Sequence, residues 1–401
     1  MLSQLYKKNL SPEDTNKILI KFGFTEDDVT TLNKLFPNKL QRVLINLALH
    51  HNDFKIQLLI SPSKANSDPI ESWVENVWNK LAAALQIEEG MTCDDIPDDQ
   101  LIVDIVEGTK RGILGLVSPY KFMIRETIER FAKSSKIVLK TKFDNEDDKF
   151  LAYANYYSIL HPEKLKNALD AEIASGIICV EENGITGISL QFIDVNKLNP
   201  KFIDGQIKIN KSSVRHIIVH IGYTFGEQTS NVIKGLIALF GKKIRSFNVI
   251  GKAGGFVGER CDVLVADRII HYEKGDVISN NTDFIDTALL AKMTNHNVFK
   301  GPLLTVAGTI LQNRSLLNYY KKFRSCIGVE MEGYYFIQEI EKYKAHGILS
   351  QALKSTYLYH ISDLPLQSGQ NLAKESELYN RDEGVPVVNA FYRFVLNNIL
   401  K

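Results

Sequence analysis

The sequence has few cysteines and no long uninterrupted apolar run, and each shortage excludes a class of protein. Its four cysteines stand far apart and form no CxxC pair. This pattern argues against a disulfide framework or a zinc site and favours a reducing cytoplasm. No stretch approaches the roughly 18 apolar residues of a membrane span, and the N-terminus lacks the apolar core of a signal peptide. We expect no metal, no cofactor and no membrane contact.

The chain also lacks a surplus of charge. Its 48 basic and 47 acidic side chains leave a formal net charge of +1. Proteins that bind nucleic acid normally carry a basic surplus, so no nucleic-acid partner is expected. With 401 residues, of which 44% are hydrophobic, the chain has the length and composition of two or three globular domains.

Residues 1–130 are predicted to be helical. Ser11-Pro12-Glu13-Asp14 combines a capping serine, a proline suited to the first turn and two acids, which is typical of a helix start. Apolar residues recur at helical spacing over 40–49 and 71–87. The polar segment 61–69 contains two prolines, so a break is expected there. We interpret 1–130 as a helical N-terminal region that precedes a second domain at 131–401.

From about residue 135 the pattern changes to alternating strands and helices, beginning with a strand expected at 136–143. Further strands are predicted at 176–180, 188–195, 206–209, 215–223, 246–250, 262–267, 303–306 and 356–361. Helices are predicted at 146–158, 162–174, 228–240, 315–322, 333–343 and 385–400. This alternation predicts an α/β fold in which helices flank a central sheet.

Three short segments combine residues that can perform chemistry, and each lies near the end of a predicted strand, where α/β sheets place their ligands. The first is Asn248-Val-Ile-Gly251-Lys252-Ala253-Gly254-Gly255. A glycine cluster after a strand lets a substrate approach the backbone and leaves N–H groups for an anion or a sugar oxygen. A plain turn would have the same sequence, so both interpretations stay open.

The second segment is Gly328-Val-Glu330-Met331-Glu332-Gly333, at the start of a predicted helix. A carboxylate can accept hydrogen bonds from two vicinal hydroxyls, the pattern that a ribose presents. A methionine offers a soft apolar surface to one face of a sugar or base. The alternative is structural, because the helix dipole favours acids in a first turn without any ligand.

The third segment is Tyr357-Leu-Tyr-His-Ile-Ser362-Asp363, an apolar strand that ends in a carboxyl group. Burial would raise the pKa of Asp363, so that it could hold a proton near neutrality and act as a general acid. The alternative is that Asp363 only caps the next turn.

Taken together, the three segments resemble the purine nucleoside phosphorylase/uridine phosphorylase superfamily, most closely its methylthioadenosine/S-adenosylhomocysteine nucleosidase branch. In that branch a Gly-[Ser/Thr]-Ala-Gly-Gly turn, a Val-Glu-Met-Glu segment and an Ile-Ser-Asp follow one another. Here they correspond to residues 251–255, 329–332 and 361–363, in the same order and at similar separations. The resemblance covers about 135–401. It implies a three-layer phosphorylase-type catalytic domain, with a mixed central sheet, that cleaves an N-glycosidic bond.

The resemblance also implies roles for individual residues. Glu332 would hold the 2′- and 3′-hydroxyls of a ribose, and Met331 would pack on the sugar. Asp363 would protonate a purine nitrogen as the base leaves, with Ser362 beside it. Further substrate-binding positions carried over in this way are Gly222, Gly251, Lys252, Ala253, Gly254, Leu311 and Glu330.

The sequence departs from the family pattern at several positions. Lys252 replaces a small hydroxyl residue, and it could either bind a phosphate or point away. The nucleosidases place a water-activating glutamate shortly after their first strand, and the candidates here are Glu146 and Asp147. Leu311 stands where the family usually has an aromatic residue near the base, which leaves the choice of base open.

Our leading hypothesis is a nucleosidase for a purine nucleoside or nucleotide, because the acidic run after the first predicted strand would repel phosphate. A phosphate-dependent nucleoside phosphorylase and a non-catalytic nucleotide sensor are the alternatives. Members of the family usually assemble, so a homo-oligomer is expected. The helical region 1–130 resembles adaptor or death-like modules of bacterial immune (antiviral) effectors, in which a protein partner would regulate the enzyme. The alternative is a stabilising or dimer-forming extension.

Overall fold

The structure, a computed structural model, divides into two compact units, Met1–Lys64 and Ala65–Lys401. The boundary lies inside the segment 61–69, where the sequence indicates a break. The residues that the structure describes are 10–21, 24–36, 40–49, 67–85, 87–88, 91–109, 112–135, 137–139, 143, 145–180, 188–308, 313–367 and 385–400.

The N-terminal unit is helical, as predicted. Its described helices are α2 (Pro12–Lys21), α3 (Glu26–Leu35) and α4 (Leu40–Leu49). A capping box begins α3, since the backbone N–H of Asp28 donates to the Thr25 hydroxyl and that of Thr25 donates to the Asp28 carboxyl. Leu19 and Val29 lie in a small apolar core shared by the helices. This core is much smaller than those of the second unit.

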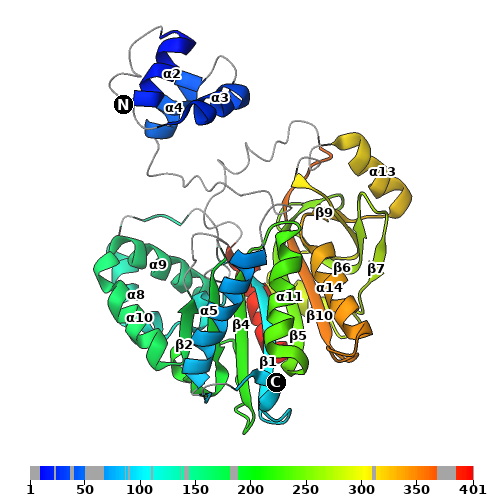
Figure 1. Ribbon diagram of the computed structural model, residues 1–401. Helices are drawn as coiled ribbons and strands as arrows, with labels where there is room; N and C mark the ends of the chain where they lie inside the picture. The colour runs from blue at the N-terminus through cyan, green and yellow to red at the C-terminus, as the bar shows by residue number, and fades with distance from the viewer. Residues whose placement is uncertain are drawn as a thin grey trace. The chain divides into compact units, whose positions relative to one another are not determined.

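The second unit is built on one mixed sheet of ten strands (Figure 1). The strands are β1 (Leu101–Gly108), β2 (Ile177–Val180), β3 (Leu190–Asp194), β4 (Arg215–Gly222), β5 (Ile244–Gly255), β6 (Val263–His271), β7 (Val277–Ser279), β8 (Val298–Thr305), β9 (Gly328–Glu330) and β10 (Lys354–Asp363). Their order is β10-β6-β8-β9-β5-β1-β4-β3-β2, with β7 paired to β6 and a further pairing of β10 with β5.

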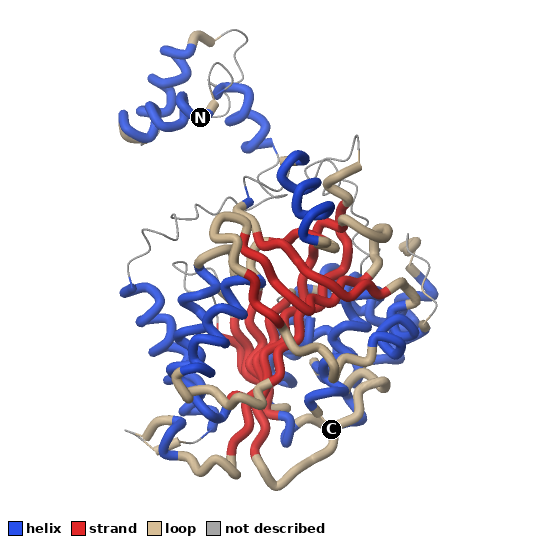
Figure 2. The backbone as a smooth tube through the Cα atoms, turned by 90° about the vertical axis from the view of Figure 1, so that its right-hand side faces the viewer, coloured by secondary structure: helices blue, strands red, loops and turns tan. Residues whose placement is uncertain are grey.

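Helices cover both faces of this sheet, which makes three layers (Figure 2). The helices are α5 (Ser67–Leu85), α6 (Gly112–Val117), α7 (Pro119–Met123), α8 (Arg125–Ser134), α9 (Glu146–Leu160), α10 (Leu165–Ala174), α11 (Gln228–Phe240), α12 (Thr287–Thr294), α13 (Arg314–Arg324), α14 (Gly333–Ala345) and α16 (Val385–Ile399). One core cluster unites α5, α11 and α14 with one face, and a second unites α6, α9 and α16 with the other. The predicted α/β class, with a mixed sheet between helical layers, is confirmed.

Four neighbouring strands in the middle of the sheet run in the same direction. β1 pairs in parallel with β4 and β5, and β5 pairs in parallel with β10. Their side chains are buried on both faces, as expected where helices cover a parallel sheet. The carboxyl ends of β1, β4, β5 and β10 therefore meet at one edge, where α/β folds place their ligands.

The structure corrects the sequence-based assignment of the first strand. Residues 101–108, inside the region expected to be helical, form β1 at the centre of the sheet. The described residues of the expected strand 136–143, which are 137–139 and 143, are not in a strand, and neither are 206–209. Residues 65–130 thus belong to the larger unit. The predicted boundary near 130 is replaced by the one at Lys64, because β1 is hydrogen-bonded on both sides within the sheet.

Candidate active site

Three glutamates meet at the carboxyl edge of the central strands, and we call them the carboxyl cluster: Glu107, Glu330 and Glu332. Glu107 is the penultimate residue of β1, Glu330 ends β9, and Glu332 immediately precedes α14. They come from distant parts of the sequence, yet the negative charges of Glu330 and Glu107 both raise the pKa of Glu332. The fold thus holds several acids in one place, which costs free energy unless ligands or protons offset the repulsion.

Glu107 is buried beneath the loop that follows β4. Its carboxyl accepts hydrogen bonds from the Thr224 backbone N–H at 2.9 Å and the Thr224 hydroxyl at 2.8 Å. These bonds favour the ionised form, but burial outweighs them and raises the pKa of Glu107 to about 7, with a smaller contribution from Glu330. A carboxyl that titrates near neutrality can take up and release a proton under ordinary conditions.

Glu330 is held by donors of the protein itself. The backbone N–H groups of Glu332 and Gly333 donate to its carboxyl at 2.8 and 2.6 Å, and the Thr305 hydroxyl donates as well. The Tyr359 hydroxyl lies 3.4 Å from the same carboxyl. These bonds fix the first turn of α14 against β8 and β10. The described contacts therefore give Glu330 a positioning role rather than the substrate contact expected from the resemblance.

Glu332 is placed by the turn that Glu330 fixes. Burial raises its pKa well above the ordinary range, and the charges of Glu330 and Glu107 add to this effect. The backbone N–H of Gly226 donates to its carboxyl and partly opposes the shift. Gly226 has φ +53°, a left-handed conformation that suits glycine. Met331 points toward Gly308, where its sulfur lies 3.4 Å from the position that an added Cβ would take.

The loop 223–227 contacts two of the three glutamates. Thr224 donates to Glu107, and Gly226 donates to Glu332, so the loop is fixed at two points on either side of Phe225. Phe225 remains 48% exposed between them. The loop begins directly after Gly222, the last residue of β4, whose missing side chain leaves room for the Ser189 hydroxyl. Gly222 thus shapes the sheet edge at the site.

Asp363 ends β10 on the other side of β5. It is buried, the Ser362 hydroxyl donates to it at 2.7 Å, and burial raises its pKa against the opposing effects of Ser362 and Arg260. Asp363 pairs with Gly254, and Gly254 pairs in turn with Val329 of β9. Two strand spacings, roughly 10 Å, therefore separate the Cα atoms of Asp363 and Val329. Asp363 lies on the same edge of the sheet as the carboxyl cluster.

The glycine segment is part of a strand and not a turn. Gly251 to Gly255 complete β5, with Gly251 opposite Tyr359 and Gly254 opposite Asp363. A Cβ on Gly251 would lie 2.8 Å from ring atoms of Tyr359. The glycines therefore allow β10 and β9 to approach β5 closely, and the expectation of a turn at 251–255 is corrected.

Lys252 points away from the carboxyl cluster. Residue 251 faces the Tyr359 ring and Ala253 lies in the same core, so Lys252 between them projects from the opposite face of the strand. There it is exposed and pairs across the strands with His360. Burial and the charge of Lys252 lower the pKa of His360 to about 4. Of the two alternatives for Lys252, the structure favours the one in which it does not face the sugar.

Comparison with known proteins gives a family for the whole chain. Residues 1–401 match the model of a family described as "Family of unknown function (DUF6909)". The chain belongs to this family. No curated protein matches it.

Solved structures similar to this chain are methylthioadenosine/S-adenosylhomocysteine nucleosidases, the branch that the sequence motifs resemble. The Campylobacter jejuni enzyme shares 15% identity with a TM-score of 0.43, covering 74% of this chain and 97% of its own. The Streptococcus pneumoniae enzyme, solved with a transition-state inhibitor, shares 11% with a TM-score of 0.42, covering 75% and 100%. The Neisseria meningitidis enzyme with methylthio-immucillin-A shares 11% with a TM-score of 0.42, covering 73% and 98%.

Glu146 and Asp147 lie elsewhere in this member of the family. They open α9, where Glu146 is exposed beside Lys149 and Asp147 pairs with Arg125 at 3.4 Å. Their candidacy depended on following the first strand, and that strand is β1. Among the described residues, the hydrogen bonds and ion pairs of these two side chains do not reach the carboxyl cluster, because α9 packs over the opposite face of the sheet. Leu311 lies outside the described residues.

Glu107 is the site residue that sequence reasoning missed. The run Leu101-Ile-Val-Asp-Ile-Val-Glu-Gly is short, rich in β-branched residues and ends in glycine, which is typical of a buried strand. The helical pattern of the surrounding region hides this signal.

The described residues contain no group of three or more potential ligands arranged to hold a metal. Within the same residues, no helix combines the length and apolarity needed to cross a membrane.

Proposed function

We propose that this chain is a nucleosidase that hydrolyses the N-glycosidic bond of a purine nucleoside or nucleotide. The observation that supports the proposal is that the carboxyl cluster and Asp363 lie at the same edge of the sheet, on strands that pair with β5. Cleavage of such a bond passes through a cationic, oxocarbenium-like sugar, and the departing base must be protonated. Buried acids on one side, and on the other a carboxyl whose pKa is raised by burial, suit both demands. The choice of a purine rests on the resemblance of residues 251–255, 329–332 and 361–363.

The reaction assigns one task to each group. Glu107 accepts a proton from a water molecule, and the hydroxide so formed attacks C1′ of the ribose. The bond between C1′ and the base nitrogen breaks, and its electron pair stays with the base. The base receives the proton of Asp363, while Glu332 holds the ribose hydroxyls. Exchange with solvent then returns a proton to Asp363 and removes one from Glu107.

Water rather than phosphate is the proposed nucleophile, for an electrostatic reason. A phosphate dianion beside Glu107 would add negative charge to a buried cluster of acids that already repel one another, and this repulsion is poorly screened. Water carries no such penalty and needs the base that Glu107 provides. A phosphorylase would require the opposite arrangement of charge around its nucleophile.

The decisive test is incubation of the full-length protein with a panel of purine nucleosides and nucleotides, with and without phosphate. Released base is separated by chromatography, and free sugar is measured in parallel. Base and free ribose in the absence of phosphate support the proposal. Turnover only with phosphate would indicate a phosphorylase. Binding without release of base from any compound, unchanged by Asp363→Asn, would indicate a sensor.

We also propose that the N-terminal unit receives a protein partner. The unit is a small helical module with its own core of Leu19, Val29, Leu40 and Leu44, and it is separate from the sheet that carries the candidate site. This layout suits a module that assembles the chain or reports on a partner. The comparison with bacterial immune effectors rests on the order of the two units along the chain, a helical module followed by an enzyme-like domain. The oligomeric state of the full chain, measured by light scattering, tests whether copies assemble.

A further inference from the structure

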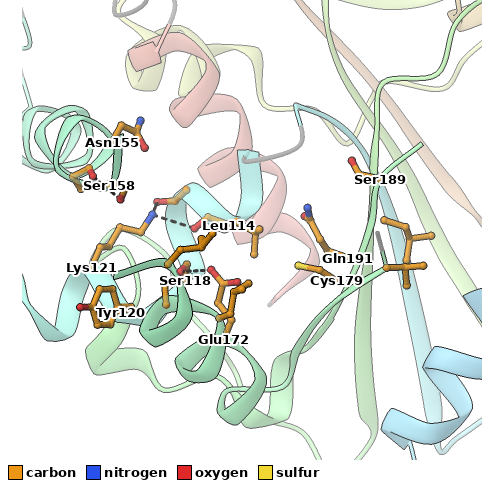
Figure 3. Close-up of a pocket in the computed structure, with 17 residues that line it drawn as sticks. Leu114, Ser118, Tyr120, Lys121, Asn155, Ser158, Glu172, Cys179, Ser189 and Gln191 are labelled. Carbon is orange, nitrogen blue, oxygen red and sulfur yellow. Dashed lines mark hydrogen bonds between the residues drawn. The ribbon is translucent and has the colours of Figure 1, made fainter. Parts of the chain in front are cut away.

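A cavity lies at the β2–β3 end of the sheet. Its volume is about 280 Å³, and its walls come from β2, β3, α6, α7, α9 and α10 (Figure 3). Its α6 and α9 walls belong to one core cluster, whereas Val180 and Leu190 belong to the cluster that also holds Val103 and Ile105 of β1. The lining includes neither Asp363 nor any residue of the carboxyl cluster.

The lining is largely apolar and partly uncovered. Leu114, Leu190 and Val180 line the inner part, and Leu165 and Leu169 of α10 line the outer part. Leu165 is 58% exposed and Leu169 is 42% exposed. When an apolar molecule covers exposed leucines on a concave surface, their side chains are removed from water, and this stabilises the complex.

A polar edge runs along one wall. The Gln191 carboxamide is buried at the cavity wall, where the Nδ1–H group of His220 donates to it at 2.6 Å. Burial lowers the pKa of His220 to about 3, so its ring is neutral. Figure 3 shows Gln191, Cys179 and Ser189 on one side of the cavity and Asn155 and Ser158 on the other. A bound molecule could thus form hydrogen bonds along its edges while its faces meet leucine side chains.

The charged groups of the lining already have partners. The Lys121 ammonium donates to the carbonyl oxygens of Leu114 and Gly115 at 3.1 and 2.6 Å. The carboxyl of Glu172 accepts a hydrogen bond from the Ser118 hydroxyl at 2.6 Å. Lys121 and Glu172 are the lining residues with a formal charge, and their charges are opposite. The lining therefore carries no net charge, which favours an uncharged ligand over an ion.

We propose that this cavity is a binding site for a small, uncharged aromatic heterocycle. The volume lies just below the range of roughly 300–1,000 Å³ that is typical of sites for drug-sized ligands, so the ligand is of about one or two rings. Flat apolar faces and a hydrogen-bonding edge match the leucines and the polar wall. This site does not depend on the proposed nucleosidase activity, because none of its residues belongs to the carboxyl cluster.

The cavity also adjoins the strand that leads to the candidate active site. Ser189 lines the cavity, and its carbonyl oxygen accepts a hydrogen bond from the Gly222 backbone N–H at 2.8 Å. Gly222 is the residue before the loop 223–227, which contacts Glu107 and Glu332. A molecule bound in the cavity would therefore lie next to Ser189, which is hydrogen-bonded to the last residue of β4.

Indole is the probe that tests the site, since it is neutral, flat and carries one N–H donor, and benzoate is its charged counterpart of similar size. Cys179 lines the cavity and is exposed, so N-ethylmaleimide modification of this thiol, followed by peptide mass spectrometry, reports occupancy. With indole at about ten times its dissociation constant, we expect the modification rate of Cys179 to fall about tenfold. Benzoate at the same concentration leaves the rate unchanged.

Two variants place a larger side chain in the cavity lining, Ala168→Phe on α10 and Ser158→Phe on α9. Both are expected to abolish protection by indole and the heat of indole binding in calorimetry. Ala174→Phe is the matched control, because it makes the same change on an exposed position of α10 away from the lining. Melting curves verify that each variant is folded. The proposal is overturned if indole fails to bind the wild type, or if a folded Ala168→Phe or Ser158→Phe protein binds it as before.

Discussion

The charge of Glu107, at the end of β1, raises the pKa of Glu332, at the start of α14. This relationship joins the first strand of the sheet to the segment that the sequence marks as the ribose site. It also means that the two carboxyls do not ionise independently, since the proton of one stabilises the charge of the other. Removing either group should therefore alter catalysis and the pH response together.

Replacing Glu107 by glutamine removes the proposed base while keeping the size of the side chain. We expect kcat to fall by about 10²- to 10⁴-fold, with KM changed much less, because general base catalysis acts in the transition state. Glu163→Gln is the control, since Glu163 lies on the surface beside His161. Steady-state rates of base release measure both. Equal loss of activity in the two variants would contradict the assignment.

The raised pKa of Glu107 also predicts a pH-dependent effect on stability. Its pKa rises from an ordinary value near 4.5 to about 7, so the folded state favours the protonated form. Below pH 4.5 both the folded and unfolded states are protonated, and no penalty arises. Between pH 4.5 and 7 the penalty grows, and it reaches about 3 kcal/mol above pH 7.

Glu107→Gln should therefore raise the melting temperature more at pH 8 than at pH 5, relative to the wild type at each pH. The loss of contacts to Thr224 affects both pH values alike and cancels in the comparison. Thermal unfolding at the two pH values measures the difference. If the shift in melting temperature were the same at both, Glu107 would titrate in its ordinary range.

Thr224→Val tests how the loop tunes the base. The hydroxyl bond from Thr224 lowers the pKa of Glu107, so its loss should move the acidic limb of the rate profile to higher pH. At pH 7 the rate falls several-fold, and at high pH it recovers. Thr31→Val, on an exposed position of α3, is the control. A rate that fell by the same factor at every pH would instead indicate that less of the protein is folded.

Gly251→Ala tests the close approach of β5 and β10. The added methyl group would meet the Tyr359 ring at 2.8 Å, and that ring carries the hydroxyl near Glu330. We expect destabilisation of about 1–3 kcal/mol, as for other overpacked cores, together with lower activity. Gly205→Ala makes the same change where nothing lies within 4 Å. Chemical denaturation compares the two, and an unaffected Gly251→Ala protein would mean that the strands can separate freely.

Removal of residues 1–64 tests the independence of the larger unit. The carboxyl cluster, Asp363 and the entire sheet lie within Ala65–Lys401. We expect the truncated protein to keep its turnover within about twofold, because no group of the site is lost. Light scattering shows at the same time whether assembly is altered. Complete loss of turnover in a folded truncated protein would tie catalysis to the N-terminal unit.

The sequence by itself determined the parts of the protein that depend on local chemistry. The spacing of apolar residues predicted the helix at 228–240, and the alternation of strands with helices predicted the α/β class. Both signals come from residues only a few positions apart in the sequence. The capping pattern Ser11-Pro12-Glu13-Asp14 likewise begins α2, where the Asp14 backbone N–H donates to the Ser11 hydroxyl. The motifs at Glu332 and Asp363 indicated two acids with separate tasks.

Only the tertiary structure decided which groups act on one another. Glu107 enters the candidate site because β1 lies between β4 and β5, a placement set by pairing between distant segments. Lys252 does not face the candidate site, because β5 continues through the glycines and alternate residues of a strand face opposite sides of the sheet. The Glu330 carboxyl accepts hydrogen bonds from the backbone of the turn that follows it. Burial and contact are properties of the folded chain, and no local pattern contains them.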